Sequence, residues 1–193
     1  MNWFDVFLTE AQQAFMFLEE VHGFGVETLT GSPSGAAVVY KEASRDPRSV
    51  WIGACPVRLE FGFSLSQQGN KASDDELLVL YSGVSCPDLE VGIWKAHRDP
   101  AALASEIQTL AARFLVLAHG FLEAPSDFWA ELAVWRSTER KSRRAKYQRE
   151  QALVAFSKSE YSRVVELLDP ISAHLRPSDR KRLEISRSRL SGA

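Results

Sequence analysis

The stretch VRLEFGFSL, residues 57–65, restricts the fold of this chain more than any other segment. Apolar residues occupy every second position, and Arg, Glu, Gly and Ser stand between them. Successive side chains of a strand point to opposite faces, so this pattern predicts an antiparallel strand with one buried and one solvated face. We expect helices to cover the apolar face, which carries Val57, Leu59, Phe61 and Phe63.

The other segments predict strands and helices that are grouped along the chain rather than alternating. The expected strands are residues 26–30, 36–41, 49–55, 77–82 and 89–95, of which 77–82 is short enough to begin a helix instead. The expected helices are residues 3–22 and 101–123, and residues 67–76 are expected to form a polar loop. Such grouping is typical of α+β folds. The sequence therefore predicts an antiparallel sheet of four to six strands, covered by helices on one face and followed by a C-terminal helical hairpin.

Charge is distributed unevenly along the chain. Residues 1–135 hold 8 Lys or Arg and 18 Asp or Glu, whereas residues 136–193 hold 15 and 7. A change of sign at one boundary indicates two segments with different surfaces. We therefore predict an acidic α+β domain at 1–135 and a basic helical extension at 136–193.

The compartment is inferred from the N-terminal segment and the cysteines. MNWFDVFLTE lacks the basic residues of a signal peptide, and the longest apolar run, 114–122, is too short to cross a bilayer. Cys55 and Cys86 are far apart and form no CxxC motif, which suits a reducing compartment. We expect a cytoplasmic protein that does not enter a membrane.

The segment AFSKSEYSRVVELLDPI, residues 155–171, resembles part of a tetratricopeptide repeat. Small residues on the first helix, Tyr161 after the turn and Pro177 at the end of the second helix carry the resemblance. The repeat is degenerate, because Ser159 stands where the family usually has glycine and Val164 where it usually has alanine.

Residues 144–190 are then expected to form one hairpin plus a capping helix, in which Leu183, Leu190 and Ile185 pack back on the hairpin. A single repeat cannot bury its apolar face alone, so we expect the hairpin to dock on the acidic domain near Trp129 and Trp135, or on a second copy of the chain. A generic helical hairpin unrelated to the repeat family is the alternative.

Residues 3–135 resemble small bacterial α+β proteins that act as immunity partners of secreted toxins. The helix ending in FLEEVHGFGVE, the paired strands and the later LAARFLVLAHGFLEAPSDFWAEL carry this resemblance. It implies a non-enzymatic protein whose partner is another protein, and the acidic surface implies that this partner is basic.

Candidate chemical groups are few. The four histidines have neither HExxH nor HxH spacing, and His119 is expected to be buried or half-buried within its apolar helix. No nucleophile, base and oxyanion donor occur in a known arrangement, so we expect no catalytic residue, no cofactor and no metal. The run Asp74, Asp75 and Glu76 lacks the ligand spacing of a calcium loop and is a candidate acidic partner-binding segment in a solvated loop.

A basic run, RSTERKSRRAKYQRE, is the second candidate site. Its candidate partner-binding residues are Arg136, Arg140, Arg143, Arg144 and Lys146. On a helix the four arginines share one face and could neutralise phosphates. The alternatives are a solvated face with internal pairs such as Glu139 with Arg143 and Lys146 with Glu150, or a stripe that faces acidic residues of the same chain or a neighbour. An adaptor that binds a peptide or nucleic acid is therefore the alternative function.

Overall fold

The computed structural model describes residues 2–55, 60–82 and 99–191. These residues divide into two compact units, Met1–Glu131 (unit 1) and Leu132–Ala193 (unit 2). The division falls inside one helix, α7, which runs over Pro125–Ser157.

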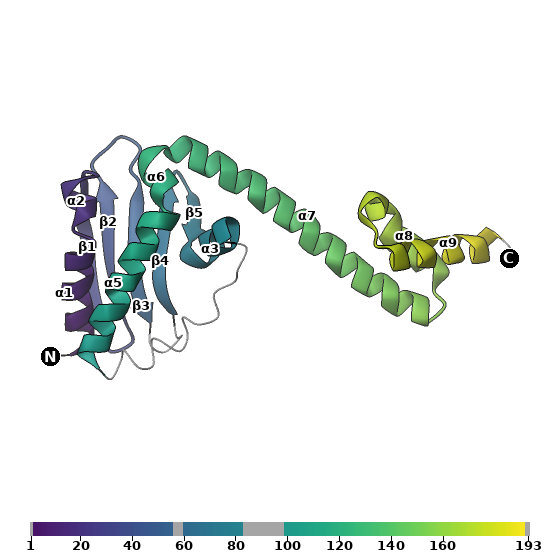
Figure 1. Cartoon of the computed structure of the whole chain (residues 1–193), viewed down its shortest axis with the longest axis horizontal. Coiled ribbons are helices and arrows are strands. Elements are labelled where there is room, and N and C mark those ends of the chain that lie inside the picture. The colour runs from purple at the N-terminus through teal and green to yellow at the C-terminus, as the bar shows by residue number, and fades with distance from the viewer. Residues whose placement is uncertain (1, 56–59, 83–98, 192–193) are drawn as a thin grey trace. The chain divides into compact units, whose positions relative to one another are not determined.

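Unit 1 contains a five-stranded antiparallel sheet in which each strand pairs with the next along the chain (Figure 1). The strands are β1 Phe24–Ser32, β2 Gly35–Glu42, β3 Ser49–Cys55, β4 Glu60–Gln67 and β5 Asn70–Ser73. The predicted α+β class and strand number are therefore confirmed. The predicted strand at 89–95 lies outside the described residues.

Alternation along the central strands determines which face of the sheet is buried. Val38, Ile52 and Phe63 are paired across β2, β3 and β4, and all three are buried. Phe61, Phe63 and Leu65 are buried as the pattern in β4 predicts. Val57 and Leu59, predicted to lie on the same face, fall outside the described residues.

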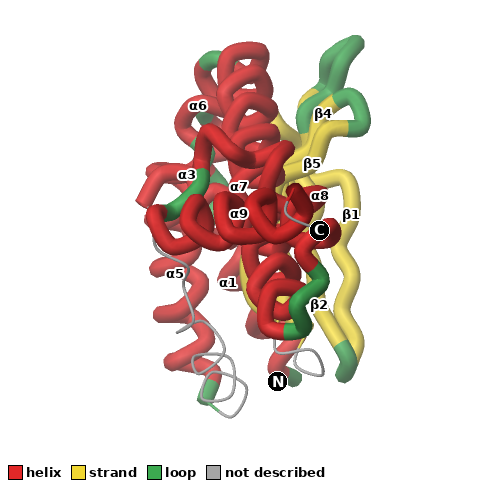
Figure 2. The backbone as a smooth tube through the Cα atoms, turned by 90° about the vertical axis from the view of Figure 1, so that its right-hand side faces the viewer, coloured by secondary structure: helices red, strands yellow, loops and turns green. Residues whose placement is uncertain are grey.

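Helices cover this apolar face (Figure 1). They are α1 Trp3–Ala14, α2 Phe17–Glu20, α3 Asp74–Ser82, α5 Pro100–Leu117 and α6 His119–Glu123. Helix α1 contacts α5, β1 and β2, and α3 contacts α5, β4 and β5. Figure 2 shows the layers from the side, with α1 and α5 on one side of the strands.

An aromatic cluster joins the helices to the sheet. Phe114 of α5 lies edge-on to Phe63 of β4, with ring centroids 4.9 Å apart, and to Phe15 at 5.4 Å. Phe7 of α1 contacts Phe61 in the same way at 6.3 Å. Buried aromatic side chains contribute large apolar areas, so these contacts position the helices on the sheet.

Two predicted helices are each divided into two. The helix expected at 3–22 stops at Ala14, and α2 begins at Phe17. The helix expected at 101–123 is interrupted at Ala118, whose φ of −96° and ψ of 3° depart from helical values. Leu117 and Phe121 on either side of the interruption are both buried, so α5 and α6 both contribute to the core.

The predicted polar loop at 67–76 is wrong. Gln68 and Gly69 have φ values of 50° and 80° and form a two-residue turn into β5. Positive φ at both central residues gives the strand twist that short hairpins favour. Helix α3 follows, so residues 77–82 form a helix and not a strand, as the alternative for that segment allowed.

Unit 2 is a small helical unit with its own core. Its elements after the C-terminal part of α7 are α8 Tyr161–Leu168, a 3₁₀ helix Asp169–His174 and α9 Pro177–Ser191. The core residues are Ala152, Ala155, Val164, Leu168, Leu175 and Leu183. Thus α9 is present as predicted and Leu183 is buried, whereas Leu190 and Ile185 are exposed. Pro177 begins α9 rather than ending the second helix, which stops at Leu168, before Pro170.

Ser159, two residues after the end of α7, has a left-handed conformation with φ of 61°. The Ser159 amide donates to the Phe156 carbonyl and the Glu160 amide to the Ala155 carbonyl, both at 3.0 Å. These two bonds form a Schellman cap, in which glycine is the usual left-handed residue. The resemblance to a tetratricopeptide repeat stays a prediction, but this position has the backbone geometry that glycine favours.

Candidate functional site

Helix α3 places the three acidic residues of the first candidate site in different environments. The Ser73 hydroxyl oxygen accepts a hydrogen bond from the Glu76 amide at 3.3 Å, so Ser73 caps the helix. Asp75 is exposed and Glu76 is half-buried, but Asp74 is only 6% exposed. The idea that this run binds a partner stays a prediction, and only Asp75 and Glu76 present surface for it.

Asp74 is buried because its carboxyl lies against Gly62 of β4. A Cβ atom on Gly62 would come within 2.5 Å of Asp74 Oδ2 and 2.8 Å of Oδ1. Any side chain larger than hydrogen at position 62 would therefore displace the carboxyl. The glycine makes the space that Asp74 occupies.

Trp51 of β3 fills the neighbouring space. Its ring lies over Gly53, where a Cβ atom would collide with it. Gly53 pairs directly with Gly62 across β3 and β4, and side chains of paired residues project from the same face of the sheet. The Trp51 ring and the Asp74 carboxyl therefore lie over adjacent glycines, on the face opposite to Ile52 and Phe63.

The electrostatics of Asp74 are unusual. Burial, and to a lesser extent the charge of Asp75, raises the pKa of this carboxyl from 3.8 to about 6. Hydrogen bonds from the backbone amides of Asp75 and Asp74 and the charge of Arg113 on α5 act in the opposite direction. Its Oδ2 atom is buried and has no hydrogen-bond partner among the described residues. A buried carboxyl without a counterion costs stability, and such groups are frequent at functional sites.

The second candidate site is the basic stripe of α7, defined as Arg136, Arg140, Arg143, Arg144 and Lys146. Arg140, Arg143, Arg144 and Lys146 are exposed and Arg136 is half-buried. Because successive helical residues are rotated by about 100°, the four arginines lie opposite Ala145 and Ala152, which are buried.

Ion pairing within the stripe is partial. The predicted pair of Arg143 with Glu139 forms at 2.8 Å. No ion pair joins Lys146 to Glu150 in the part of the chain that the structure describes. Tyr147 lies within the stripe and is 61% exposed.

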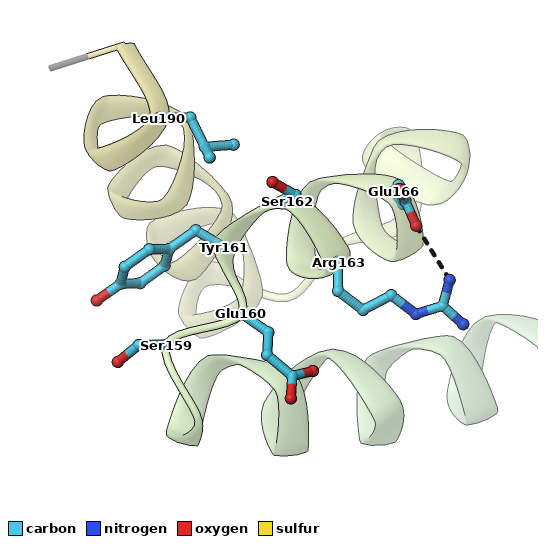
Figure 3. Close-up of a pocket in the computed structure, with 7 residues that line it drawn as sticks. All are labelled: Ser159, Glu160, Tyr161, Ser162, Arg163, Glu166 and Leu190. Atoms are coloured by element: carbon cyan, nitrogen blue, oxygen red, sulfur yellow. Dashed lines mark hydrogen bonds and ion pairs between the residues drawn. The ribbon is translucent and has the colours of Figure 1, made fainter. Parts of the chain in front are cut away.

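Unit 2 also contains an open pocket, shown in Figure 3. Tyr161 and Leu190 lie at one end of it, and an ion pair of Arg163 with Glu166 at 3.0 Å lies at the other. Both members of this pair are exposed, so water screens their charges. This ion pair therefore gives the pocket no unscreened charge that could act on a ligand.

Arg48 is a structural group that sequence patterns did not reveal. Its guanidinium donates to both Glu42 carboxylate oxygens at 2.9 Å, and to the carbonyls of Phe121 at 2.7 Å and Leu122 at 2.6 Å. It also lies over the rings of Phe24 and Phe121. The hydrogen bonds from Arg48 lower the pKa of Glu42. This residue fastens the end of α6 to the sheet.

The described residues contain neither a candidate metal site nor a candidate membrane-spanning helix. Residues 2–55, 60–82 and 99–191 contain no group of three or more His, Cys, Asp or Glu side chains that could hold a metal. Over the same ranges, no helix combines the length and the apolar character needed to cross a bilayer. His119 is exposed, contrary to expectation, because it begins α6 directly after the interruption at Ala118. His97 and Cys86 lie outside the described residues.

Comparisons with protein-family models, curated proteins and solved structures gave no match. A function must therefore be argued from the residues of this chain.

Proposed function

We propose that this chain is a non-enzymatic protein that binds a basic partner protein through unit 1, in the manner of a cytoplasmic immunity protein that blocks a bacterial toxin. The observation that carries the proposal is the acidic surface of unit 1. Its exposed carboxylates among the described residues are Asp5, Glu19, Glu20, Glu27, Asp75, Asp99, Glu123, Asp127 and Glu131.

Among the described residues of unit 1, the exposed basic residues are Arg45 and Lys71, against nine exposed carboxylates. Lys41 is paired with Glu27 at 2.6 Å, and Arg48 is buried against Glu42. The acidic surface is therefore available to a partner of opposite charge. Complementary charge accelerates association and selects against partners of the same sign.

The test uses the protein encoded beside this chain in its genome as the candidate partner. Affinity is measured by titration calorimetry for the native chain and for Glu123→Lys, Asp127→Lys, Glu131→Lys combined. The matched control carries the same charge change in unit 2, Glu139→Lys, Glu150→Lys, Glu160→Lys. We expect the unit 1 variant to lose at least about tenfold in affinity and the control to bind like the native chain. Absence of a complex, or equal losses in both variants, would contradict the proposal.

A second candidate function is supported by the exposed basic stripe. Its arginines and Tyr147 resemble the combination of cationic and aromatic side chains that binds single-stranded nucleic acid. Anisotropy of a labelled oligonucleotide at low salt tests this function, with Arg140→Glu, Arg143→Glu, Arg144→Glu as the variant. The control places the same reversal at Arg176, which precedes α9, and at Arg180 and Lys181 of α9. Binding that only the first variant abolishes supports the adaptor function, and no binding by the native chain eliminates the nucleic-acid form of it.

A further inference from the structure

A pair of glycines leaves a platform in the middle of the sheet, on the face opposite to the aromatic core. Gly53 and Gly62 are direct partners in β3 and β4. Neither contributes a side chain, so the surface above them is filled by two groups from elsewhere, the Trp51 ring and the Asp74 carboxyl. An aromatic face and a carboxylate are thus held next to each other by the backbone of the sheet.

The carboxyl of Asp74 is buried without an ion-pair partner among the described residues. It is 6% exposed, and its Oδ2 atom has no hydrogen-bond partner. None of the ion pairs among the described residues includes Asp74. Arg113 acts on it through its charge, but its own Nη1 atom is also buried without a partner. The fold therefore keeps a desolvated acid whose second oxygen is buried without a hydrogen-bond donor.

We propose that Trp51 and Asp74 form a binding site for one Arg or Lys side chain of a basic partner protein. This inference rests on the proposed function, since it names the position at which unit 1 recognises its partner. The cation lies over the indole ring and donates a hydrogen bond to Asp74 Oδ2. Cations are attracted to aromatic faces, most strongly to that of tryptophan, and a charged donor forms the strongest hydrogen bonds with a carboxylate.

The chemistry of the site favours an organic cation over a metal ion. A calcium or magnesium ion takes six or more oxygen ligands, as a rule, and this site offers one carboxylate and an indole. An arginine or lysine side chain needs only one acceptor and gains from the aromatic surface. The exposed carboxylate of Asp75, next to Asp74 in α3, adds attraction at the entrance.

The two groups of the site differ in exposure. Trp51 is 37% exposed, whereas Asp74 is almost completely enclosed. The indole is therefore the part of the site that a ligand meets first, and the ligand reaches Oδ2 only after the side chains around Asp74 move. A single buried anchor of this kind is typical of the positions that dominate protein interfaces.

The test uses the full chain and a small probe. The indole Nε1–H resonance of Trp51, assigned with Trp51→Phe, is followed by NMR while N-acetyl-arginine amide is added. N-acetyl-citrulline amide is the matched control, because it has nearly the same shape without the charge. We expect the arginine derivative to shift the Trp51 resonance, and Asp74→Asn to weaken this binding by about tenfold or more. The variant Asp75→Asn should change it by less than about threefold, because Asp75 is exposed.

The pH dependence gives a second readout. The ionised carboxylate binds the cation, so affinity should rise as pH increases through about 6 and fall below it. The other charged groups that act on Asp74 are Asp75 on α3 and Arg113 on α5. This rise in affinity with pH should be absent in Asp74→Asn. The variant therefore distinguishes titration of Asp74 from titration of other groups.

Three results would overturn the inference: no shift of the Trp51 resonance, an equal shift with the citrulline derivative, or unchanged binding in Asp74→Asn. The failure of this site and the failure of the proposed function can be told apart. If reversal of Glu123, Asp127 and Glu131 weakens binding of the whole partner but Asp74→Asn does not, the function stands and the site is wrong. If the arginine derivative binds at Trp51 but no basic protein does, the site stands and the function is wrong.

Discussion

Asp74→Asn should make unit 1 more stable at neutral pH, although it removes a buried hydrogen-bonding charge. The pKa of Asp74 is about 6 in the folded chain and 3.8 as its ordinary value. Because the folded value is the higher one, the contribution of Asp74 to stability is fully present below about pH 3.8 and is lost as pH rises through about 6. At pH 7 the native protein therefore carries the full cost of a buried, ionised carboxylate.

The size of this cost follows from the shift. A difference of about two pKa units, at about 1.4 kcal/mol per unit, corresponds to an upper limit of about 3 kcal/mol. Asparagine keeps the shape of the side chain and stays neutral, so it avoids the cost. We expect the variant to gain about 1–3 kcal/mol at pH 7 and almost nothing below about pH 4.

Urea unfolding, followed by fluorescence and circular dichroism between pH 4 and pH 8, measures this gain. Asp75→Asn is the matched control, because it changes an exposed carboxylate one residue away and should alter stability by less than about 0.5 kcal/mol. Loss of stability in Asp74→Asn at pH 7, or a gain independent of pH, would refute the reasoning. Asp74 would then be an ionised carboxylate in the first turn of α3 that its backbone hydrogen bonds stabilise.

Three further substitutions test the packing. Phe63→Ala should cost unit 1 about 3–5 kcal/mol in urea unfolding, because the ring is buried against Phe114; a loss below about 1 kcal/mol would mean that the core is assigned wrongly. Arg48→Ala should lower the free energy of unfolding by about 3–5 kcal/mol, because it leaves Glu42 and two buried carbonyls without their donor. Arg48→Lys should recover only part of this lost stability, and full recovery would contradict a role for the planar guanidinium. Ser159→Gly should stabilise unit 2 by about 0.5–1 kcal/mol in thermal melts, because glycine adopts the left-handed conformation without strain, and Ser159→Val should have the opposite effect.

Alternating hydrophobicity was sufficient to predict the central sheet. The pattern in β4 predicted both the strand and the burial of Phe61 and Phe63, because one buried face enforces a period of two. The helical period at 101–123 predicted a helix but not its interruption at Ala118. Nothing in the local pattern marks Ala118, because Leu117 and Phe121 on either side of it are both apolar and both buried.

The start of α3 could have been found in the sequence. Ser73 and Glu76 have the spacing of a capping box, and the hydroxyl of Ser73 does accept from the Glu76 amide. This signal predicts a helix from residue 74, where composition alone suggested a solvated loop and a strand. Composition could not predict the start of the helix, because acidic residues are common both in the first turn of helices and in solvated loops.

The candidate site itself could be predicted only in part. Trp51 stands on the wet face of its strand, an unusual place for a large aromatic residue, and that was a usable signal. The position of Asp74 was not predictable, because it depends on a contact with Gly62 that forms only when α3 follows β5 at the sheet edge. Arg48 was missed for the same reason, since its carbonyl partners lie more than 70 residues away.

The central claim is that the acidic surface of unit 1 binds a basic partner, and the salt dependence of association tests it most directly. Stopped-flow mixing of the full chain with the protein encoded beside it gives the association rate constant at each salt concentration. The account predicts that this constant falls at least about tenfold between about 50 mM and about 500 mM NaCl, while dissociation changes much less. An association rate that is insensitive to salt, or the absence of any complex at the lowest salt concentration, would contradict it.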